Sequence, residues 1–600
     1  MALYLEKLKI SNFRKIANAE FKFSEGLNII VGANNIGKTA VVDALRSLLA
    51  GHEEPYSRFS VDDIHRPMDG SPPTGDIAFQ FVFANLSLAD EADFLPALVP
   101  IDTGGFEAHI TVSYGIVDTA TGRMRPKRWC GEYEEIGLNS DMLENLRGVY
   151  LQPLRDASQG LKPGRNSQLA RLLRLLGEND QAGKDNIEST LEEFDQKLKK
   201  TSPIKATQTA IAGRHETMLG EQLAQLLALG ISGTDFNRLS ARLTLQADAF
   251  DIDQNGLGFN NLIYMAVVLS EMAKDPTVVY RGLIVEEPEA HLHPQLQSVL
   301  LEYLQGIKSD NSDSSVQVFV TSHSPNFASI ANLDSIVCLA ESKDDVKAFH
   351  PRDVRFDSKD KEHLKKRQKL ERYLDVTRAE LFFARRVIFV EGAAELLLIS
   401  VLAKKMGAAY DLRKHAISLI SVEGLNFDSF LPLFGETSLQ LPVSAITDAD
   451  PFIIEGEGDD AETVPVYPDL GDEITVSDNA AGMKKREDKL VKVFHGVKTL
   501  EYDLALYENN RDVMISALEE LHPQISKSLK VEVDKAPTSK DKAKTLFCGM
   551  FERGKGKKNV QKGRYAQVLA QTIEDKDTEF KVPEYIEMAL KHVCDFKGVI

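Results

Sequence analysis

One stretch near the N-terminus has the residue types of a phosphate-binding loop. An apolar run, 28–31, leads into Gly32, and the next residues fit the pattern G-x-x-x-x-G-K-[ST]. Glycines let a backbone turn several N–H groups toward an anion. In such a loop the lysine reaches the outer phosphates of ATP and the hydroxyl holds Mg²⁺. A glycine-rich turn with a chance lysine is the alternative. The predicted ATP-binding residues here are Asn34, Asn35, Gly37, Lys38 and Thr39.

Two acidic residues end a second apolar run far downstream. Residues 282–285 lead into Glu286 and Glu287. Because side chains alternate along a strand, the two carboxylates are predicted to lie on opposite sides of its end. Glu286 suits the Mg²⁺ shell, and Glu287 suits a general base that polarises water. A later run, 316–320, precedes His323, which fits a γ-phosphate sensor. The order of loop, acids and histidine predicts ATP binding with hydrolysis.

The C-terminal third contains two further pairs of carboxylates. Glu391 ends the strand-like run 386–390, and Glu395 lies one turn into the helix predicted to follow, so the two can converge on one cation. Asp448 and Asp450 follow another strand-like run and are predicted to alternate out on the same side. Two such pairs in one α/β unit are what a Mg²⁺ or Mn²⁺ site for phosphodiester chemistry requires.

The spacing E-G-x-x-E followed by D-x-D resembles the Toprim domain of topoisomerases, primases and small nucleases. With ATPase motifs ahead of it, the chain resembles the OLD (overcoming lysogenization defect) nuclease family, which includes the nuclease subunit of the Gabija anti-phage system. The resemblance spans nearly the whole chain, apart from residues 157–235 and 451–490. It implies an α/β fold in which a RecF/SMC-like ABC ATPase head with a helical dimerisation insertion precedes a Toprim (Rossmann-like) nuclease domain.

The same resemblance implies roles for individual residues. Lys562 matches the family's late lysine, which would stabilise the transition-state phosphate. Gln152, at the end of a strand-like run, matches the glutamine that helps ATP-binding-cassette proteins hold Mg²⁺ and the attacking water. Arg14, in Asn-Phe-Arg, matches an arginine near the nucleotide, and a solvated strand-end charge is the alternative. The implied metal ligands are Glu391, Glu395, Asp448, Asp450, Glu501 and Asp503, and the catalytic residues are Glu287, Lys562, Glu391 and Asp448.

The length and composition of the chain predict several domains. A chain of 600 residues exceeds one core, and 43% hydrophobic and 27% charged residues are typical of a globular protein. Leucines recur at helical spacing in the insertion, at positions 169, 172, 173 and 176 and again at 223, 226 and 227. We expect that insertion to dimerise, with plain core helices as the alternative. The predicted limits are 1–156 and 236–372 for the ATPase parts, 157–235 for the insertion and 380–600 for the Toprim domain.

Charge and hydropathy indicate whether the protein can bind nucleic acid or a membrane. The net charge of −19 excludes a basic coat, but it leaves room for a local nucleic-acid surface. Basic residues are densest at Arg553, Lys555, Lys557, Lys558, Lys562 and Arg564. No apolar run reaches the length of a membrane span, and the first residues lack the layout of a signal peptide, so we expect a cytoplasmic protein without membrane contact.

These features together predict an ATP-regulated, divalent-metal-dependent DNA endonuclease that cuts or nicks DNA. The cofactors would be ATP and Mg²⁺, with Mn²⁺ or Ca²⁺ possible at the Toprim site. Family resemblance suggests anti-phage defence, a homodimer or higher homo-oligomer, and a helicase or reverse-transcriptase partner. The alternative from another class is a RecF-like DNA-repair ATPase or clamp without nuclease activity.

Overall fold

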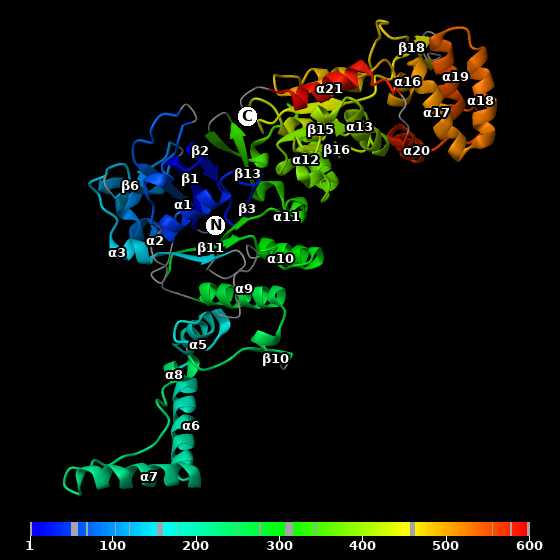
Figure 1. The fold of residues 1–600 in the computed structure, drawn as a ribbon. Helices are drawn as coiled ribbons and strands as arrows, with labels where there is room; N and C mark the ends of the chain where they lie inside the picture. The colour runs from blue at the N-terminus through cyan, green and yellow to red at the C-terminus, as the bar shows by residue number, and fades with distance from the viewer. Residues whose placement is uncertain are drawn as a thin grey trace.

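The computed structural model consists of an N-terminal head, a helical arm inserted within the sequence of the head, and a C-terminal α/β domain (Figure 1). Among its described helices, none has both the length and the apolar composition needed to cross a bilayer. The structure describes residues 3–49, 58–67, 70–102, 104–118, 121–152, 160–178, 180–248, 250–274, 278–306, 316–342, 345–455, 462–554, 556–575 and 579–596.

The head contains an antiparallel sheet near the N-terminus and a mostly parallel sheet behind it. The first has the order β2-β1-β4-β6-β5, with β7 paired to β6, and the second has the order β14-β13-β3-β12-β11-β8. The strands of the first are β1 (Tyr4–Phe13), β2 (Ile16–Lys22), β4 (Ile77–Ala84), β5 (Leu98–Pro100), β6 (Phe106–Asp118) and β7 (Arg123–Cys130). Those of the second are β3 (Leu27–Gly32), β8 (Leu146–Leu151), β11 (Tyr280–Glu286), β12 (Gln317–Thr321), β13 (Ile336–Ser342) and β14 (Asp345–Phe349).

Helices cover both faces of the parallel sheet. One core joins α1 to the antiparallel sheet and to one face of the parallel sheet, and another joins α9, α10 and α11 to its opposite face. Burial on both faces explains why these strands are continuous apolar runs in the sequence. The head helices are α1 (Lys38–Leu49), α2 (Leu88–Asp93), α3 (Ser140–Glu144), α9 (Leu257–Lys274), α10 (Pro294–Gly306) and α11 (Pro325–Ile330).

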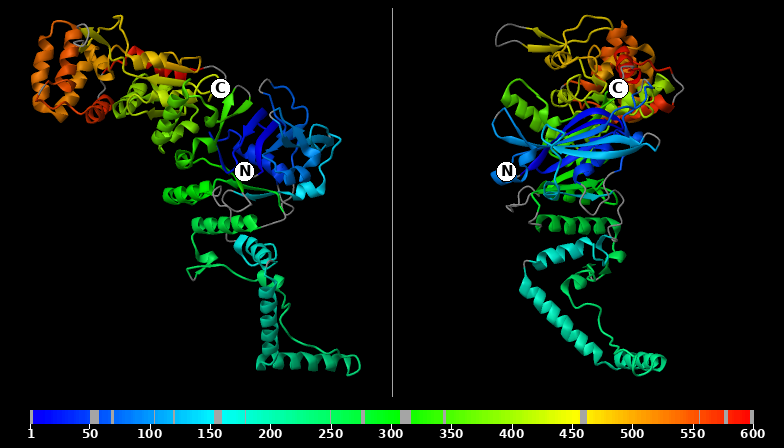
Figure 2. Two further views of the ribbon diagram at one scale, coloured as in Figure 1. Left: turned by 180° about the vertical axis from the view of Figure 1, so that it is seen from behind. Right: turned by 90° about the vertical axis from the view of Figure 1, so that its left-hand side faces the viewer.

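The insertion forms an arm that leaves the head at α9. Its first helix packs on α9, and the next two extend away from the rest of the molecule in every view (Figures 1 and 2). The prediction of a helix through Leu223, Leu226 and Leu227 is wrong, because α7 ends at Leu219 and Gly220 follows with a φ of 77°. The arm elements are α5 (Gln168–Glu178), α6 (Gln181–Lys199), α7 (Ser202–Leu219), α8 (Phe236–Ser240), β9 (Gln246–Ala247) and β10 (Phe250–Asp251).

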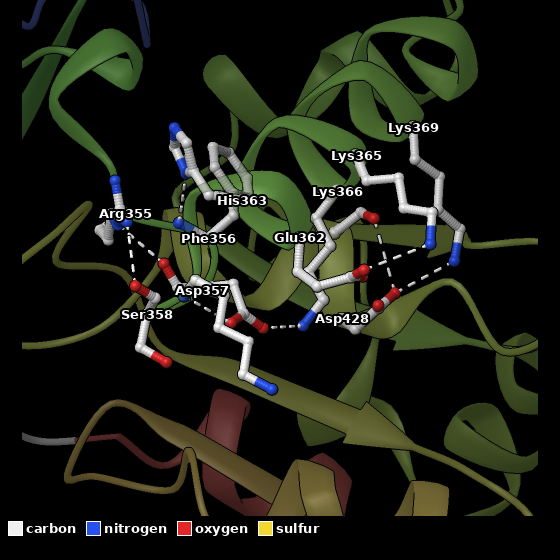
Figure 3. Close-up of polar contacts among 12 residues, drawn as sticks. Arg355, Phe356, Asp357, Ser358, Glu362, His363, Lys365, Lys366, Lys369 and Asp428 are labelled. Carbon is white, nitrogen blue, oxygen red and sulfur yellow. Dashed lines mark hydrogen bonds and ion pairs between the residues drawn. The ribbon is translucent and has the colours of Figure 1, made fainter.

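A charged helix, α12 (Asp360–Tyr373), leads out of the head toward the C-terminal domain. Its cations are paired with acids rather than only solvated (Figure 3). Lys366 Nζ donates to Asp357 at 2.7 Å, and Lys369 Nζ donates to Asp428 of α14 at 3.1 Å. The latter bond ties α12 to the C-terminal domain.

The C-terminal domain contains a parallel sheet of order β16-β15-β17-β20, flanked by helices. Its strands are β15 (Arg386–Val390), β16 (Ile417–Ser421), β17 (Val443–Ile446) and β20 (Val491–Phe494), and a separate hairpin pairs β18 (Phe452–Glu455) with β19 (Glu462–Pro465). The helices are α13 (Ala393–Lys405), α14 (Phe427–Phe430), α15 (Asp478–Lys484), α16 (Leu500–Ala505), α17 (Glu508–Leu521), α18 (Pro523–Lys535), α19 (Ser539–Phe551), α20 (Lys562–Asp575) and α21 (Glu584–Cys594).

The two α/β parts share apolar contacts. A single cluster of buried residues runs from Ile29 and Val320 in the head to Val387 and Val443 in the C-terminal sheet. Domains that share a core move less freely than domains joined by a linker alone. The predicted limits of the domains stay a prediction.

Candidate functional sites

The phosphate-loop motif connects β3 to α1, as its residues predict. Gly32 has a φ of +148°, and a Cβ there would lie 2.8 Å from the carbonyl oxygen of Leu339, so no larger residue fits. Gly37 has a φ of +115°. α1 begins at Lys38, and Asn34, Asn35 and Thr39 are exposed beside it. The loop therefore presents backbone N–H groups and a helix N-terminus to solvent, as an anion site requires.

Lys38 folds back over its own loop. Its Nζ donates to the carbonyl oxygens of Gly32, at 2.7 Å, and Ala33, at 3.0 Å. Burial lowers the pKa of Lys38 to about 8, although Cys338, Glu287 and Glu289 act in the opposite direction. The ammonium is thus held in a poorly hydrated place, where a phosphate would interact with it strongly.

The paired acids meet their predicted neighbours at one edge of the parallel sheet. Glu286 is the last residue of β11 and is buried, and it accepts a hydrogen bond of 2.6 Å from the hydroxyl of Tyr150. Burial raises the pKa of Glu286. Glu287 does not continue the strand: its φ is 46°, so turn geometry and not strand alternation separates the two carboxylates. Its Oε1 lies 3.5 Å from Nε2 of His323.

The sheet register brings Gln152 to the same edge. Leu151, the last residue of β8, pairs with Val285 of β11. The residues that come next, Gln152 and Glu286, therefore lie at the same edge of the sheet. Glu286 in turn pairs with Thr321 on β12, directly ahead of the His323 turn. Parallel strands end together at one edge of a sheet, which is where α/β proteins bind ligands.

Sequence reasoning missed two residues of this region, Glu289 and Tyr150. Glu289 Oε1 accepts hydrogen bonds from the Ser322 hydroxyl, at 2.9 Å, and from the backbone N–H of His323, at 2.8 Å. It thereby fixes the histidine turn, and Tyr150 fixes Glu286 in the same way. Arg14 donates to Asp43 of α1 at 2.7 Å and to Asp63 at 2.8 Å, so it is a paired residue and not a solvated strand end. The E-P-E spacing was the only signal for Glu289.

In the C-terminal domain, the ends of β15 and β17 bring two predicted carboxylates into contact. Glu391 Oε1 accepts hydrogen bonds from the backbone N–H of Asp448, at 2.8 Å, and from the hydroxyl of Thr447, at 2.6 Å. β15 and β17 are parallel neighbours, which explains why residues distant in the sequence meet here. The structure therefore places the E-G-x-x-E and D-x-D motifs side by side.

Helices α16 and α20 add a third carboxylate and a lysine to this place. Glu501 is 2% exposed, and its Oε2 accepts hydrogen bonds from Lys562 Nζ, at 2.9 Å, and Thr499 Oγ1, at 3.2 Å. Its other oxygen, Oε1, is buried and lacks a hydrogen-bond partner among the described residues. We call Glu391, Asp448 and Glu501 the carboxylate cluster.

The cluster carries more negative charge than its surroundings balance. Burial raises the pKa of Asp448 well above its ordinary value, and Glu391 and Glu501 raise it further. Burial opposes the charge on Lys562, but Glu501 and Asp448 raise its pKa overall. Neighbouring carboxylates shift each other's pKa in this direction because they repel when both are ionised.

Other predicted ligands serve different contacts. Glu395, whose pKa is raised by burial, accepts from the backbone N–H of Gly392 at 3.0 Å and so caps α13. β17 ends at Ile446, and Asp450 has a φ of 39° and is exposed, so the predicted alternation of Asp448 and Asp450 is wrong. Asp503, whose pKa burial raises to about 8, accepts from the backbone N–H groups of Val497, at 3.2 Å, and Lys498, at 3.1 Å.

A ready-made metal centre is absent from the described residues: no three His, Cys, Asp or Glu side chains there are arranged as ligands around one point. The helix cap at Glu395 and the backbone contacts of Asp503 account for part of this result. Of the basic cluster near Lys562, Lys555 lies outside the described residues. The metal-ligand roles stay a prediction.

Known families match both parts of the chain. Residues 7–118 match the family described as AAA domain, and residues 137–328 match AAA ATPase domain. Residues 382–450 match Overcoming lysogenization defect protein-like, TOPRIM domain. An OLD nuclease of Thermus scotoductus is 26% identical over 408 residues, which are 65% of this chain and 71% of that protein. The chain is therefore similar to an OLD nuclease over about two thirds of its length.

Two more proteins resemble this OLD-like chain. An endonuclease GajA of Bacillus cereus is 23% identical over 464 residues, or 68% of this chain and 63% of that protein. The C-terminal region of the OLD protein of Burkholderia pseudomallei aligns with a TM-score of 0.25 and 27% identity, covering 36% of this chain and 98% of that one. The predicted order of an ATPase head followed by a TOPRIM domain is confirmed by the matched families.

Proposed function

We propose that this OLD-like enzyme is an ATP-regulated, divalent-metal-dependent DNA endonuclease that cuts or nicks DNA. The observation that carries the proposal is the hydrogen bond from the Asp448 N–H to Glu391, which joins the two acidic motifs at one point. Beside them lies Lys562, a cation that can contact a phosphate. The relatives named OLD nuclease and endonuclease GajA support the same class of reaction.

The residues of the cluster fit a divalent cation. Hard cations such as Mg²⁺ take carboxylate oxygens, and Glu501 Oε1 is a buried carboxylate oxygen without a hydrogen-bond partner among the described residues. The raised pKa of Asp448 reflects burial and the repulsion that a cation would relieve. Glu391, Asp448 and Glu501 are the residues we propose to hold it. When bound, a divalent cation would supply water activation and charge neutralisation.

The chain's own residues have separable tasks in this reaction. Thr447 and the backbone N–H of Asp448 fix the orientation of Glu391. The N–H of Leu500 donates to Asp448 Oδ1 at 3.2 Å and fixes that carboxylate. Lys562 holds its proton firmly, because Glu501 and Asp448 raise its pKa, so it stays a cation for the scissile phosphate.

ATP would act from the head. In our proposal Lys38 and Thr39 bind the phosphates and Mg²⁺, Gln152 and Glu286 complete that shell, Glu287 polarises water, and His323 senses the γ-phosphate. The core shared by the head sheet and the TOPRIM sheet gives a physical path between the two sites, since packed elements transmit displacement. We further propose a homodimer or higher homo-oligomer formed through the arm.

A role in defence against phage, with a helicase or reverse-transcriptase partner, follows by analogy with the Gabija system, and fold alone does not establish it. The alternative, a RecF-like repair clamp, has one observation on its side. Among the described residues the predicted ligands do not form a complete metal group.

Cleavage of supercoiled plasmid separates the two functions. The wild type with Mg²⁺ or Mn²⁺ should nick or cut, and Glu391→Ala, Asp448→Ala and Lys562→Ala should each lose most of that activity while still hydrolysing ATP. Exposed Glu423, beyond the E-G-x-x-E turn, offers a control in Glu423→Ala, which should cut normally. A wild type that hydrolyses ATP yet leaves plasmid intact with every divalent ion would favour the clamp.

A further inference from the structure

Lys498 is a buried lysine that the nuclease proposal leaves unused. It lies in the loop between β20 and α16 and is 4% exposed. Lysine is almost never buried to this degree without an acidic partner. Within the described residues, no carboxylate oxygen lies close enough to its Nζ to form an ion pair. Its charge is therefore not balanced by a close ion pair within the described chain.

Aromatic rings hold the ammonium in place. Lys498 Nζ lies over the ring of Tyr467, 4.5 Å from its centroid, and 5.8 Å from the centroid of Phe547. Ring faces attract cations but do not replace the hydration of an ammonium. Tyr467 is itself fixed, since its hydroxyl donates to Glu552. The ammonium is thus held in one position, and its N–H groups stay available as hydrogen-bond donors to a ligand.

The backbone of the same residue connects it to the candidate nuclease site. The carbonyl oxygen of Lys498 accepts from the N–H groups of Ala449, at 2.8 Å, and Asp450, at 3.3 Å. Its N–H donates to Asp503, which anchors the loop to α16. Lys498 therefore lies against the D-x-D loop, on the side of the exposed Asp450.

The electrostatics agree with this placement. Burial raises the pKa of Asp450, and two cations oppose that shift, Lys498 first and Lys562 second. Both ammonium groups therefore lie within electrostatic range of Asp450, the exposed residue of the D-x-D loop. A second cation near the scissile position would bind a neighbouring DNA phosphate, while Lys562 contacts the scissile phosphate.

We propose that Lys498 is a second phosphate-contacting residue of the nuclease site, which binds a DNA phosphate next to the scissile one. The inference rests on the proposed function for its setting, but it concerns DNA binding as well as cleavage. A merely structural lysine would support the loop without touching DNA. The two roles differ in their salt dependence, because each phosphate contact releases counterions.

Lys544 provides a matched control. Its Nζ lies 4.7 Å from the centroid of the same Tyr467 ring, but Lys544 is exposed whereas Lys498 is buried. Lys544→Met removes an ammonium from the same ring without removing the buried charge. Lys498→Arg keeps a charge, and Lys498→Met and Lys498→Gln remove it.

The experiment uses the full chain, a short DNA duplex in EDTA to measure binding, and plasmid with Mg²⁺ to measure cleavage. Lys498→Met should lower the slope of log affinity against log salt by about 0.9, the value for one phosphate contact. It should also lower kcat/KM for cleavage about 10- to 100-fold, at or below the usual effect of removing one catalytic donor. Lys544→Met and Lys498→Arg should keep the wild-type slope.

If Lys498→Met keeps the wild-type dependence of log affinity on log salt, the inference is overturned and the lysine is structural. The same conclusion follows if Lys498→Arg has a lower slope than the wild type. Should Lys498→Met fail to fold, Lys498→Gln decides by the same slope. If the wild type binds DNA but never cleaves it, the nuclease proposal fails, and the salt slope still tests Lys498 by itself.

Discussion

Two lysines show how local surroundings set the chemistry of one residue type. Lys38 is buried among carbonyl oxygens, and burial lowers its pKa to about 8. Lys562 is also partly buried, but Glu501 and Asp448 raise its pKa. The first can lose its proton within an accessible pH range, and the second cannot. Lysine titration therefore gives the nucleotide site a pH dependence that Lys562 does not give the nuclease site.

Affinity for ATP should fall as Lys38 loses its charge. A pKa of about 8 leaves the ammonium mostly charged at pH 7 and mostly neutral at pH 9. If ATP binds only the charged form, its affinity falls about tenfold over that interval. Titration calorimetry with a non-hydrolysable ATP analogue measures this change. The control is Lys38→Arg, because its guanidinium stays charged over this pH range. The pH dependence of this variant measures the effect of ionisation of the nucleotide alone. An equal pH dependence of ATP affinity in both proteins would contradict the role of Lys38.

At the scale of elements, the arm is joined to the head by a buried ion pair. Glu271 of α9 accepts from Arg147 of β8 at 2.6 Å and lies 3.4 Å from Arg171 of α5. Its side chain is 4% exposed. Three elements therefore meet at one carboxylate, near the start of β8. Removing one member of a buried pair leaves the other charges uncompensated.

Glu271→Ala should destabilise the junction of α5, α9 and β8 by about 3 to 5 kcal/mol. Thermal unfolding followed by scanning calorimetry would show a lower midpoint. Glu193→Ala on α6 is the control, because that residue is 74% exposed and lies 3.8 Å from Lys197, and surface pairs contribute at most about 1 kcal/mol. Similar midpoints for the two variants would mean that the ion pair does not join the arm to the head.

At the scale of the whole molecule, helices α6 and α7 of the arm extend away from the head (Figure 2). Several apolar side chains of the arm are exposed. Leu226 is 100% exposed, Met218 81% and Ile211 47%. Exposed apolar groups gathered on one element are typical of an interaction site. A cavity of about 580 Å³ lies between α7 and the segment that follows it, and its lining includes Ile211, Met218 and Leu227.

Replacing Ile211 and Met218 by glutamate should convert the proposed homodimer to monomers, because two charges would have to be buried in the interface. Light scattering after size-exclusion chromatography gives the mass. The thermal midpoint should stay unchanged, since neither side chain is buried within one chain. Thr217→Glu, on the same helix, is a control for added charge. An unchanged mass for the double variant would exclude this face as the interface.

The sequence by itself determined the elements that carry each motif. Gly32, Lys38 and the apolar runs around them predict strand, loop and helix, because local φ/ψ and hydropathy restrict such short segments strongly. The same holds for Glu391 after β15 and for the continuous apolar strands of the head. Strand alternation failed at Glu287 and Asp450, where the backbone turns to positive φ and the strand has already ended.

Only the tertiary structure decided which side chains meet. Glu501 of α16 and Lys562 of α20 form an ion pair, whereas Asp503, two residues from Glu501, accepts from the backbone of the loop ahead of α16. No spacing rule distinguishes these neighbours, since the choice depends on how α16 packs on α19 and on the end of β20. The burial of Lys498 is a property of the same packing. Long-range contacts and the desolvation of side chains depend on how the elements pack, whereas the motifs depend on residues that are close together in the sequence.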